Sequence, residues 1–173
     1  MRRMPILLLL VAPAIASAAG MASRAASPPQ DVPCNEIIHS TKFPYRTDGY
    51  RLVLDVVSVP PAYLRQVVRT NIKPWVYWRK AGLVVRAGSP RVSVRVAKAW
   101  RTRVAITWGN TTGIVSSVRI PSCPAALSGE QAKGGNAYAG GFYLRSRSAC
   151  VPLIFGVGKR RATIRFGLGR PCR

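Results

Sequence analysis

The stretch VPLIFGVGKRRATIRFGL, from Val151 to Leu168, holds two apolar runs on either side of the basic segment 158–161. In the second run Ile164, Phe166 and Leu168 alternate with polar residues or glycine. This period of two is typical of a strand with one face on a core and the other in water. Gly158, followed by cationic residues, is a turn signal. The stretch therefore predicts a hairpin of two antiparallel strands, 151–157 and 162–168.

Two cysteines, Cys150 and Cys172, flank this hairpin. In an antiparallel hairpin the start of the first strand lies beside the end of the second, so we expect these cysteines to pair. An even number of cysteines in an exported chain indicates disulfides. The other two, Cys34 and Cys123, would then form the second bridge and fasten the amino-terminal part to the middle of the chain.

Similar alternation runs through much of the sequence. Strands are expected at 91–96, 103–108, 76–78, 83–86, 115–120 and 142–147, with a more central, apolar strand at 52–59. Gly140 and Gly141 precede one of these strands, where a bulge or a corner is expected. Short strands separated by turn signals predict an all-β fold, a single immunoglobulin-like or related β-sandwich with two disulfides. A barrel is the alternative.

One segment departs from the strand pattern. In residues 60–69, Tyr63, Leu64, Val67 and Val68 recur at helical spacing, and two prolines stand at the start. Proline suits the first turn of a helix. The segment therefore predicts one short surface helix that links two strands.

The first 18 residues resemble a secretory signal peptide. Arg2 and Arg3 precede an apolar run, and a small-residue cleavage site ends at Ala18. The apolar run is too short to span a bilayer, so no transmembrane span is expected once the signal is removed. Residues 19–33, rich in Ala, Ser and Pro, read as a flexible lead-in, and residues 34–173 as the folded domain. The expected location is secreted or extracytoplasmic.

The charge of the chain is strongly unbalanced. Lys and Arg number 27 and Asp and Glu number 5, which gives a formal net charge of +22. Such a charge favours a polyanionic partner: an anionic cell-wall polymer, an acidic glycan, an anionic lipid surface or a nucleic acid. Compositional drift in a GC-rich genome explains the excess of arginine over lysine. It does not explain the scarcity of acids.

Motifs for catalysis and cofactor binding are missing from the sequence. His39 is the sole histidine, so a nucleophile would lack its usual base, and there is no cluster of zinc ligands. The glycines do not have the spacing of nucleotide-binding loops. The five acids, Asp31, Glu36, Asp48, Asp55 and Glu130, form no evident catalytic pair, and Asp55 is expected to pair with an arginine. We therefore expect no catalytic residue, metal or cofactor.

Candidate binding residues follow from the strand alternation. Arg91, Arg95 and Arg165 point away from their core-facing neighbours, and Tyr143, Arg145 and Arg147 share a strand face. If some of these strands adjoin, their outer faces form a continuous basic surface.

Aromatic residues also gather near cations. Trp75, Tyr77 and Trp78 precede Arg79 and Lys80, and alternation puts Trp75, Tyr77 and Arg79 on one face. Exposed rings of this kind stack on sugars or bases, whereas buried ones fill a core. Trp108 and one of Trp75 and Trp78 are expected in the core.

These patterns predict a secreted, non-catalytic binding module for an anionic polymer at the cell envelope. The alternative is a structural or protein-interaction domain of the envelope whose charge is incidental. Strong salt dependence of polyanion binding distinguishes the first from the second.

Overall fold

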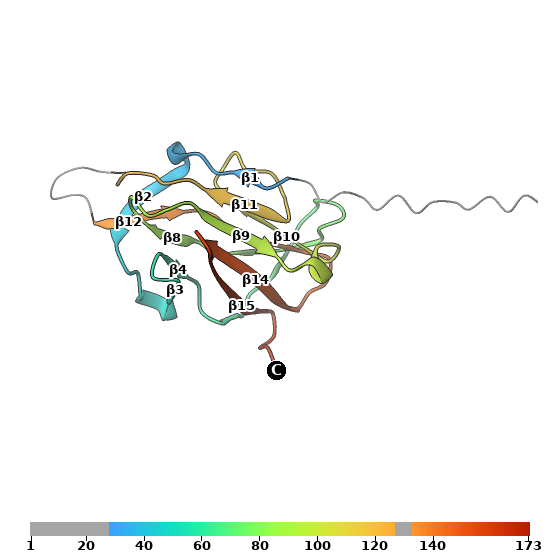
Figure 1. Cartoon of the computed structure of the whole chain (residues 1–173). Coiled ribbons are helices and arrows are strands. Elements are labelled where there is room, and N and C mark those ends of the chain that lie inside the picture. The colour runs from blue at the N-terminus through green and yellow to red at the C-terminus, as the bar shows by residue number, and fades with distance from the viewer. Residues whose placement is uncertain (1–27, 127–132) are drawn as a thin grey trace, which may run out of the picture.

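A computed structural model describes residues 28–126 and 133–173, which consist almost entirely of strands and loops (Figure 1). The three helical segments in this part are single 3-10 turns: η1 (Cys34–Glu36), η2 (Thr47–Gly49) and η3 (Lys98–Trp100). The predicted all-β class is confirmed. The signal peptide expected at 1–18, the first part of the lead-in and Glu130 lie outside the described residues.

One layer of the fold is a six-stranded sheet. Its strands, in spatial order, are β1 (Gln30–Asp31), β11 (Ser117–Ile120), β9 (Val92–Val96), β14 (Ala149–Val157), β15 (Arg160–Leu168) and β5 (Tyr63–Leu64). The two edge pairs are parallel and the inner pairs are antiparallel. The nine-residue strands β14 and β15 form the hairpin predicted from the sequence, and Gly158 turns the chain with a φ of 55°.

The other layer consists of two sheets, and the chain passes from one sheet to the other without a long loop. The four-stranded sheet runs β10 (Val104–Trp108), β13 (Gly140–Leu144), β7 (Tyr77–Lys80) and β6 (Val68–Arg69). The five-stranded sheet runs β2 (Ile37–Lys42), β12 (Gly134–Tyr138), β8 (Leu83–Arg86), β4 (Val57–Val59) and β3 (Arg51–Val53). The chain passes directly from β7 to β8 and from β12 to β13, so the two sheets meet at a corner.

The predicted glycine pair lies at this corner. A Cβ atom on Gly140 would be 2.1 Å from the carbonyl oxygen of Thr107, and one on Gly141 would be 2.1 Å from that of Arg79. Real Cβ atoms do not approach a carbonyl oxygen so closely, so the neighbouring strands can pass only because both residues lack a side chain. The expectation of a corner at this pair is confirmed.

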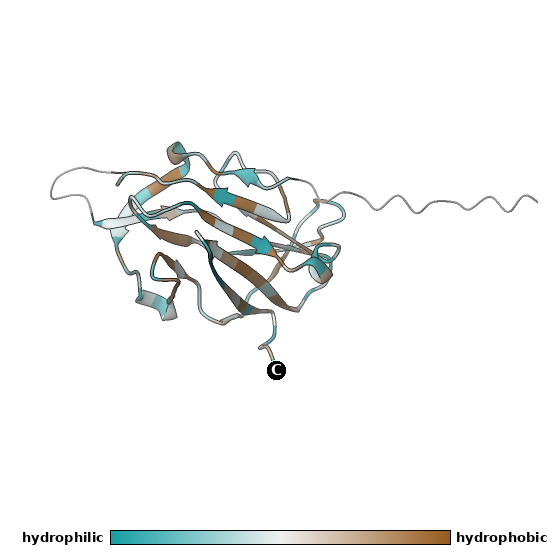
Figure 2. Cartoon of the chain, viewed as in Figure 1, coloured by the Kyte–Doolittle hydropathy of each residue, from teal (hydrophilic) through white to brown (hydrophobic). Residues whose placement is uncertain are grey.

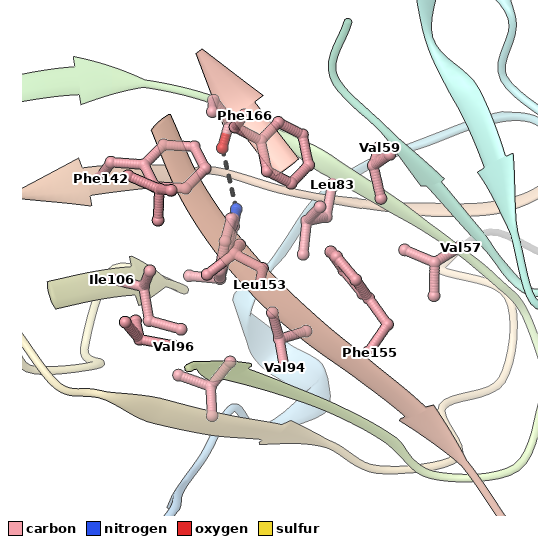
Figure 3. Packing of buried hydrophobic residues seen from close by; sticks show 14 of the residues in the cluster. Val57, Val59, Leu83, Val94, Val96, Ile106, Phe142, Leu153, Phe155 and Phe166 are labelled. Carbon is pink, nitrogen blue, oxygen red and sulfur yellow. Dashed lines mark hydrogen bonds between the residues drawn. The ribbon is translucent and has the colours of Figure 1, made fainter. Parts of the chain in front are cut away.

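A single hydrophobic core lies between the two layers. Figure 3 shows Val94, Leu153, Phe155 and Phe166 of the six-stranded sheet meeting Phe142 and other side chains of the opposite layer. Figure 2 shows hydrophobic residues concentrated in the strands, where hydrophilic residues alternate with them, and mostly hydrophilic residues in the turns. Trp108 is fully buried and donates its indole N–H to the carbonyl of Ala81 at 2.8 Å. Its predicted place in the core is confirmed.

Both predicted disulfides are present. Cys150 pairs with Cys172 across the end of the β14–β15 hairpin, and Cys34 pairs with Cys123. The hairpin geometry that predicted the first bridge is the geometry observed.

The helix predicted at 60–69 is wrong. The segment contains the short strands β5 and β6, and the backbone N–H groups of Gly167 and Gly169 donate to the carbonyls of Ala62 and Leu64. The helical spacing of its apolar residues is outweighed by this pairing with the end of β15. The adjacent valines Val67 and Val68 also favour an extended backbone.

Two other boundaries differ from expectation. The single strand predicted at 52–59 is the hairpin β3–β4, because Leu54 and Asp55 turn the chain with positive φ angles of 52° and 61°. The folded domain also includes residues before Cys34, where it was expected to begin. Val32 is fully buried, and Gln30–Asp31 pair with β11 as β1.

Candidate polyanion-binding surfaces

The outer face of the six-stranded sheet carries arginines from adjoining strands. Arg95 on β9 lies opposite Ile154 of β14, and Arg165 on β15 lies opposite Pro152 of the same strand. Side chains of paired residues lie on the same face of an antiparallel ladder. Because the valines on either side of Arg95 are fully buried, this is the solvent face. The backbones of Arg95 and Arg165 are therefore about 12 Å apart, two strand spacings across and two residues along β14.

Other arginines extend this surface. Arg119 of β11 pairs with Ser93, and Ser93 pairs with Gly156, which in turn pairs with Arg161. A Cβ on Gly156 would be 3.0 Å from the Cδ and Nε of Arg161, so this arginine lies across the glycine toward β9. We call this surface the basic face; it consists of Arg91, Arg95, Arg119, Arg161 and Arg165.

The arginines of the basic face differ in the partners that their guanidinium groups have within the protein. Arg119 forms two hydrogen bonds with the carboxylate of Asp31, at 2.8 and 3.0 Å. Arg161 donates to the carbonyl oxygens of Gly158 and Arg160, at 2.7 and 2.8 Å. No acidic partner in residues 28–126 or 133–173 pairs with Arg91, Arg95 or Arg165. Their charge is available to an external anion.

The outer face of the four-stranded sheet is aromatic instead. Val68, Trp78, Tyr143 and Ala105 form one row across all four strands. The rings of Trp78 and Tyr143 are 6.4 Å apart at an angle of 45°. Both side chains are half-buried, so each ring leaves part of its surface to solvent.

Cations lie against further rings near this sheet. The guanidinium of Arg145, directly after β13, is 5.4 Å from the ring centre of Trp75. That of Arg103 is 4.2 Å from the ring centre of Trp100. Both distances are within the range of cation–π attraction.

The sequence-predicted residues therefore separate onto two sheets. Arg91, Arg95 and Arg165 lie on the outside of the six-stranded sheet, whereas Tyr143 and Arg145 belong to the four-stranded sheet in the other layer. The strands that carry Arg95 and Arg165 adjoin through β14, whereas β13 pairs with β10 and β7 and not with β9 or β15, so Tyr143 and Arg145 are not part of that surface.

Two expectations for the aromatic segment were wrong. Trp75 and Trp78 are both half-buried, so neither fills the core in the way Trp108 does. Tyr77 packs against the core, and Arg79 lies opposite the buried Phe142. Trp75 does not share their face, because it precedes β7 and contacts Arg145.

Arg147 lies beyond β13 and lines a hollow of about 600 Å³ with Arg65, Gln66, Val67, Val68, Ser148 and Gly169. A second hollow, of about 580 Å³, is lined by Cys150, Arg170, Pro171 and Arg173. Arg147 thus lies outside β13, in a hollow that also includes Val68 of the outer row that carries Tyr143.

The described acids have structural roles. Asp31 pairs with Arg119, and Asp55 pairs with Arg160 at 2.8 Å, as expected for that acid. Asp48 occupies a left-handed turn position with a φ of 57°. Buried Glu36 accepts hydrogen bonds from the backbone N–H groups of Asn110 and Thr111, and these bonds together with the Thr111 side chain lower the pKa of its carboxyl group.

The described residues offer little for metal or acid–base chemistry. No group of three His, Cys, Asp or Glu side chains in this part of the chain is placed to hold a metal ion. His39 is exposed on β2 and lines a hollow of about 210 Å³ with Tyr45 and Tyr50. None of the helices described here is long and apolar enough to cross a membrane.

Neither a comparison with protein-family models nor a search of the curated proteins finds a match to this sequence.

Sequence reasoning missed some members of these surfaces. Arg119 lies between Val118 and Ile120, an alternation that was sufficient to place it on the outside. Arg161 was assigned to the turn, but it belongs to β15. Tyr45 and Tyr50 gave no local signal, because the loop that carries them reaches the sheet only through tertiary contacts.

Proposed function

We propose that this protein is a secreted, non-catalytic module that binds an anionic polymer of the cell envelope. One observation carries the proposal: Arg91, Arg95 and Arg165 lie on one solvent face without an acidic partner in the described chain. Guanidinium groups form strong paired hydrogen bonds with carboxylate, sulfate and phosphate groups. A polyanion bound along β9, β14 and β15 would release its counterions, which favours binding at low salt.

The two disulfides support the proposed location. Such bridges form and persist outside the reducing cytosol. Anionic polysaccharides and wall polymers are the polyanions that an exported protein meets there. The net charge of +22 would also speed encounter with these polymers.

The test measures binding to immobilised heparin, a general acidic polymer, between about 50 and 200 mM salt. Replacing Arg91, Arg95 and Arg165 together with Ser should weaken binding and reduce the slope of log K against log salt concentration by about 2 to 3, because each contact contributes about 0.7–0.9 to that slope. The free energy of unfolding should change by less than about 1 kcal/mol, since exposed charges contribute little to stability.

A matched control removes the same charge elsewhere. Lys42, Arg46 and Lys133 are exposed near the far end of β2 and β12. Their combined replacement with Ser should leave most of the binding intact. Equal losses in both triple variants would indicate a non-specific charge effect. Heparin binding that is missing at low salt would favour the alternative, a structural or protein-interaction domain.

A further inference from the structure

The aromatic residues on the outside of the second layer form a track that crosses the corner between its two sheets. Trp78 and Lys80 point outward from β7, and Lys80 also lines the hollow that contains Tyr45 and Tyr50. The other walls of this hollow include Val84 and Ala137, which are paired residues on the outer face of the five-stranded sheet.

We use the name aromatic track for Tyr45, Tyr50, Trp78, Tyr143 and Trp75. Tyr45 and Tyr50 are in edge-to-face contact at 4.8 Å, and the hydroxyl of Tyr50 donates to the carbonyl of Gly82 at the corner. All five side chains are half-buried. Each is therefore held by packing on one side and open on the other, which gives contact area at a low cost in side-chain entropy.

Two cations lie between the rings of the track. Lys80 is exposed between the tyrosine pair and Trp78, and Arg145 is exposed next to Trp75. No carboxylate in residues 28–126 or 133–173 forms an ion pair with either cation. The track thus offers apolar ring faces at short intervals with an isolated positive charge beside each group of rings.

We propose that the aromatic track binds the sugar rings of an acidic polysaccharide, with Lys80 and Arg145 meeting its acidic groups. The inference names the polymer class for the proposed function and rests on it. The apolar C–H face of a sugar ring carries a partial positive charge and is attracted to the electron-rich face of an aromatic ring. The carboxylate or sulfate on the ring edge then reaches the neighbouring cation.

The density of charge favours a polysaccharide over a nucleic acid. A single-stranded nucleic acid presents one phosphate for every base that it stacks, so its binding groove needs cations along its whole length. The track has two cations for five rings, and the cluster of arginines lies on the opposite layer. An acidic polysaccharide in which only some rings carry a charge fits this ratio. The disulfides also indicate a compartment where nucleic acid is not the main polymer.

The test compares three probes of equal total charge: a partly methyl-esterified oligogalacturonate, in which only some rings carry a free carboxylate, a linear polyphosphate and an oligo-dT strand. Affinities are measured at low and high salt, and tryptophan fluorescence reports contact with Trp75 or Trp78. We expect the oligogalacturonate to bind most tightly, to retain binding at high salt and to change the fluorescence. Polyphosphate should bind only at low salt and leave the fluorescence unchanged.

Variants identify the rings. Tyr143→Ala and Trp75→Ala should each weaken oligogalacturonate binding by about 5- to 100-fold, the range for loss of one stacked ring, and leave polyphosphate binding unchanged. Tyr63→Ala is the matched control, because Tyr63 is 39% exposed on β5, away from the track. If Tyr143→Ala unfolds the protein, Lys80→Gln removes an exposed cation of the track without disturbing packing and should weaken oligogalacturonate binding.

The outcomes separate this inference from the proposed function. Equal affinity for all three probes, with no effect of the track variants, would overturn the aromatic track and leave the polyanion-binding module standing. Tightest binding of oligo-dT, weakened by Tyr143→Ala, would assign the track to nucleic acid and overturn the polysaccharide. If no probe binds at low salt, the proposed function and the inference both fail.

Discussion

At the scale of single residues, Glu36 links two distant loops through its carboxylate. It follows Cys34 in η1 and holds the backbone N–H groups of residues 110 and 111. The side-chain hydrogen bond from Thr111 and these backbone hydrogen bonds favour the ionised form, so the pKa of the carboxyl group is lowered below its usual 4.5. A lowered pKa in the folded state adds stability above the pKa of the unfolded chain, and this stability is lost as the pH falls through the folded value.

We therefore predict that Glu36→Gln makes the stability of the protein less dependent on pH in the acid range. The melting temperature of the wild type should fall as the pH is lowered below about 4.5, and that of the variant should fall less, because the amide does not titrate. Thermal unfolding at a series of pH values measures both curves. Parallel curves would show that other carboxyl groups cause the acid instability.

The contrast between Trp108 and Asp55 provides a second prediction. Trp108→Ala should lower the free energy of unfolding by about 3–5 kcal/mol, because it leaves a cavity in the core and removes the hydrogen-bond donor to the carbonyl of Ala81. Asp55→Asn should cost less than about 1 kcal/mol, since its ion pair with Arg160 is exposed on both sides. Urea unfolding of both variants measures the difference. A similar cost for the two would contradict the burial of Trp108.

At the scale of elements, the two disulfides close loops of different length. The sequence separation is 89 residues for Cys34–Cys123 and 22 residues for Cys150–Cys172. In the chain-entropy account the longer loop restricts the unfolded chain more. Replacing the Cys34–Cys123 pair with Ala should cost about 1 kcal/mol more than replacing the other pair. Denaturant unfolding measures both costs, and peptide mapping without reduction checks the pairing. A larger cost for the short loop would indicate that native-state packing dominates.

The corner between the two sheets of the second layer depends on glycine. Gly141→Ala should destabilise the protein by about 3 kcal/mol or more, because the new methyl group would meet the backbone of β7 and not a movable side chain. Gly88→Ala is the control. Its Cβ meets nothing within 4 Å, and its φ of 66° alone should cost about 1 kcal/mol. Thermal or urea unfolding ranks the two variants, and equal costs would contradict the close approach at the corner.

At the scale of the whole molecule, the basic face and the aromatic track lie on opposite layers. Their contributions should therefore be independent for a short acidic oligosaccharide. A short oligosaccharide reaches one face at a time, so Arg95→Ser with Arg165→Ser should weaken only binding to the basic face, and Tyr143→Ala only binding to the aromatic track. The combined variant should weaken the two sites by the same factors as the separate variants, within about twofold. Titration of each variant with the same oligosaccharide checks this, and a Tyr143→Ala variant that also weakens binding to the basic face would show that both surfaces hold one segment.

A long polymer should behave differently from a short one. If one chain reaches both faces, the second contact becomes intramolecular, and affinity rises well beyond that for either face. Affinity for fragments of increasing length should then increase steeply above the length that spans both layers. A steady increase without such a step would limit each polymer to one face.

Several features of this fold were predictable because they are local. The alternation in 91–96, 103–108 and 151–168 identified strands β9, β10, β14 and β15, since burial of one face imposes a period of two. The glycine in the turn of the hairpin then fixed its ends well enough to pair Cys150 with Cys172. By contrast, β12 has the sequence GGNAY, which has no strand pattern, and it is a strand only because β2 and β8 pair with it on both sides.

The sequence by itself determined the all-β class, the pairing of Cys150 with Cys172 and the outward direction of Arg95 and Arg165, because each of these depends on neighbours along the chain. Only the tertiary structure decided which outward faces belong together. The order of strands places Arg95 and Arg165 on one sheet and Tyr143 in the other layer. The tertiary contacts also place Tyr45 and Tyr50 beside Lys80. Strand pairing also replaced the predicted helix with β5 and β6, because the pairing of β5 with β15 and of β6 with β7 satisfies backbone groups that an isolated segment would satisfy by forming a helix.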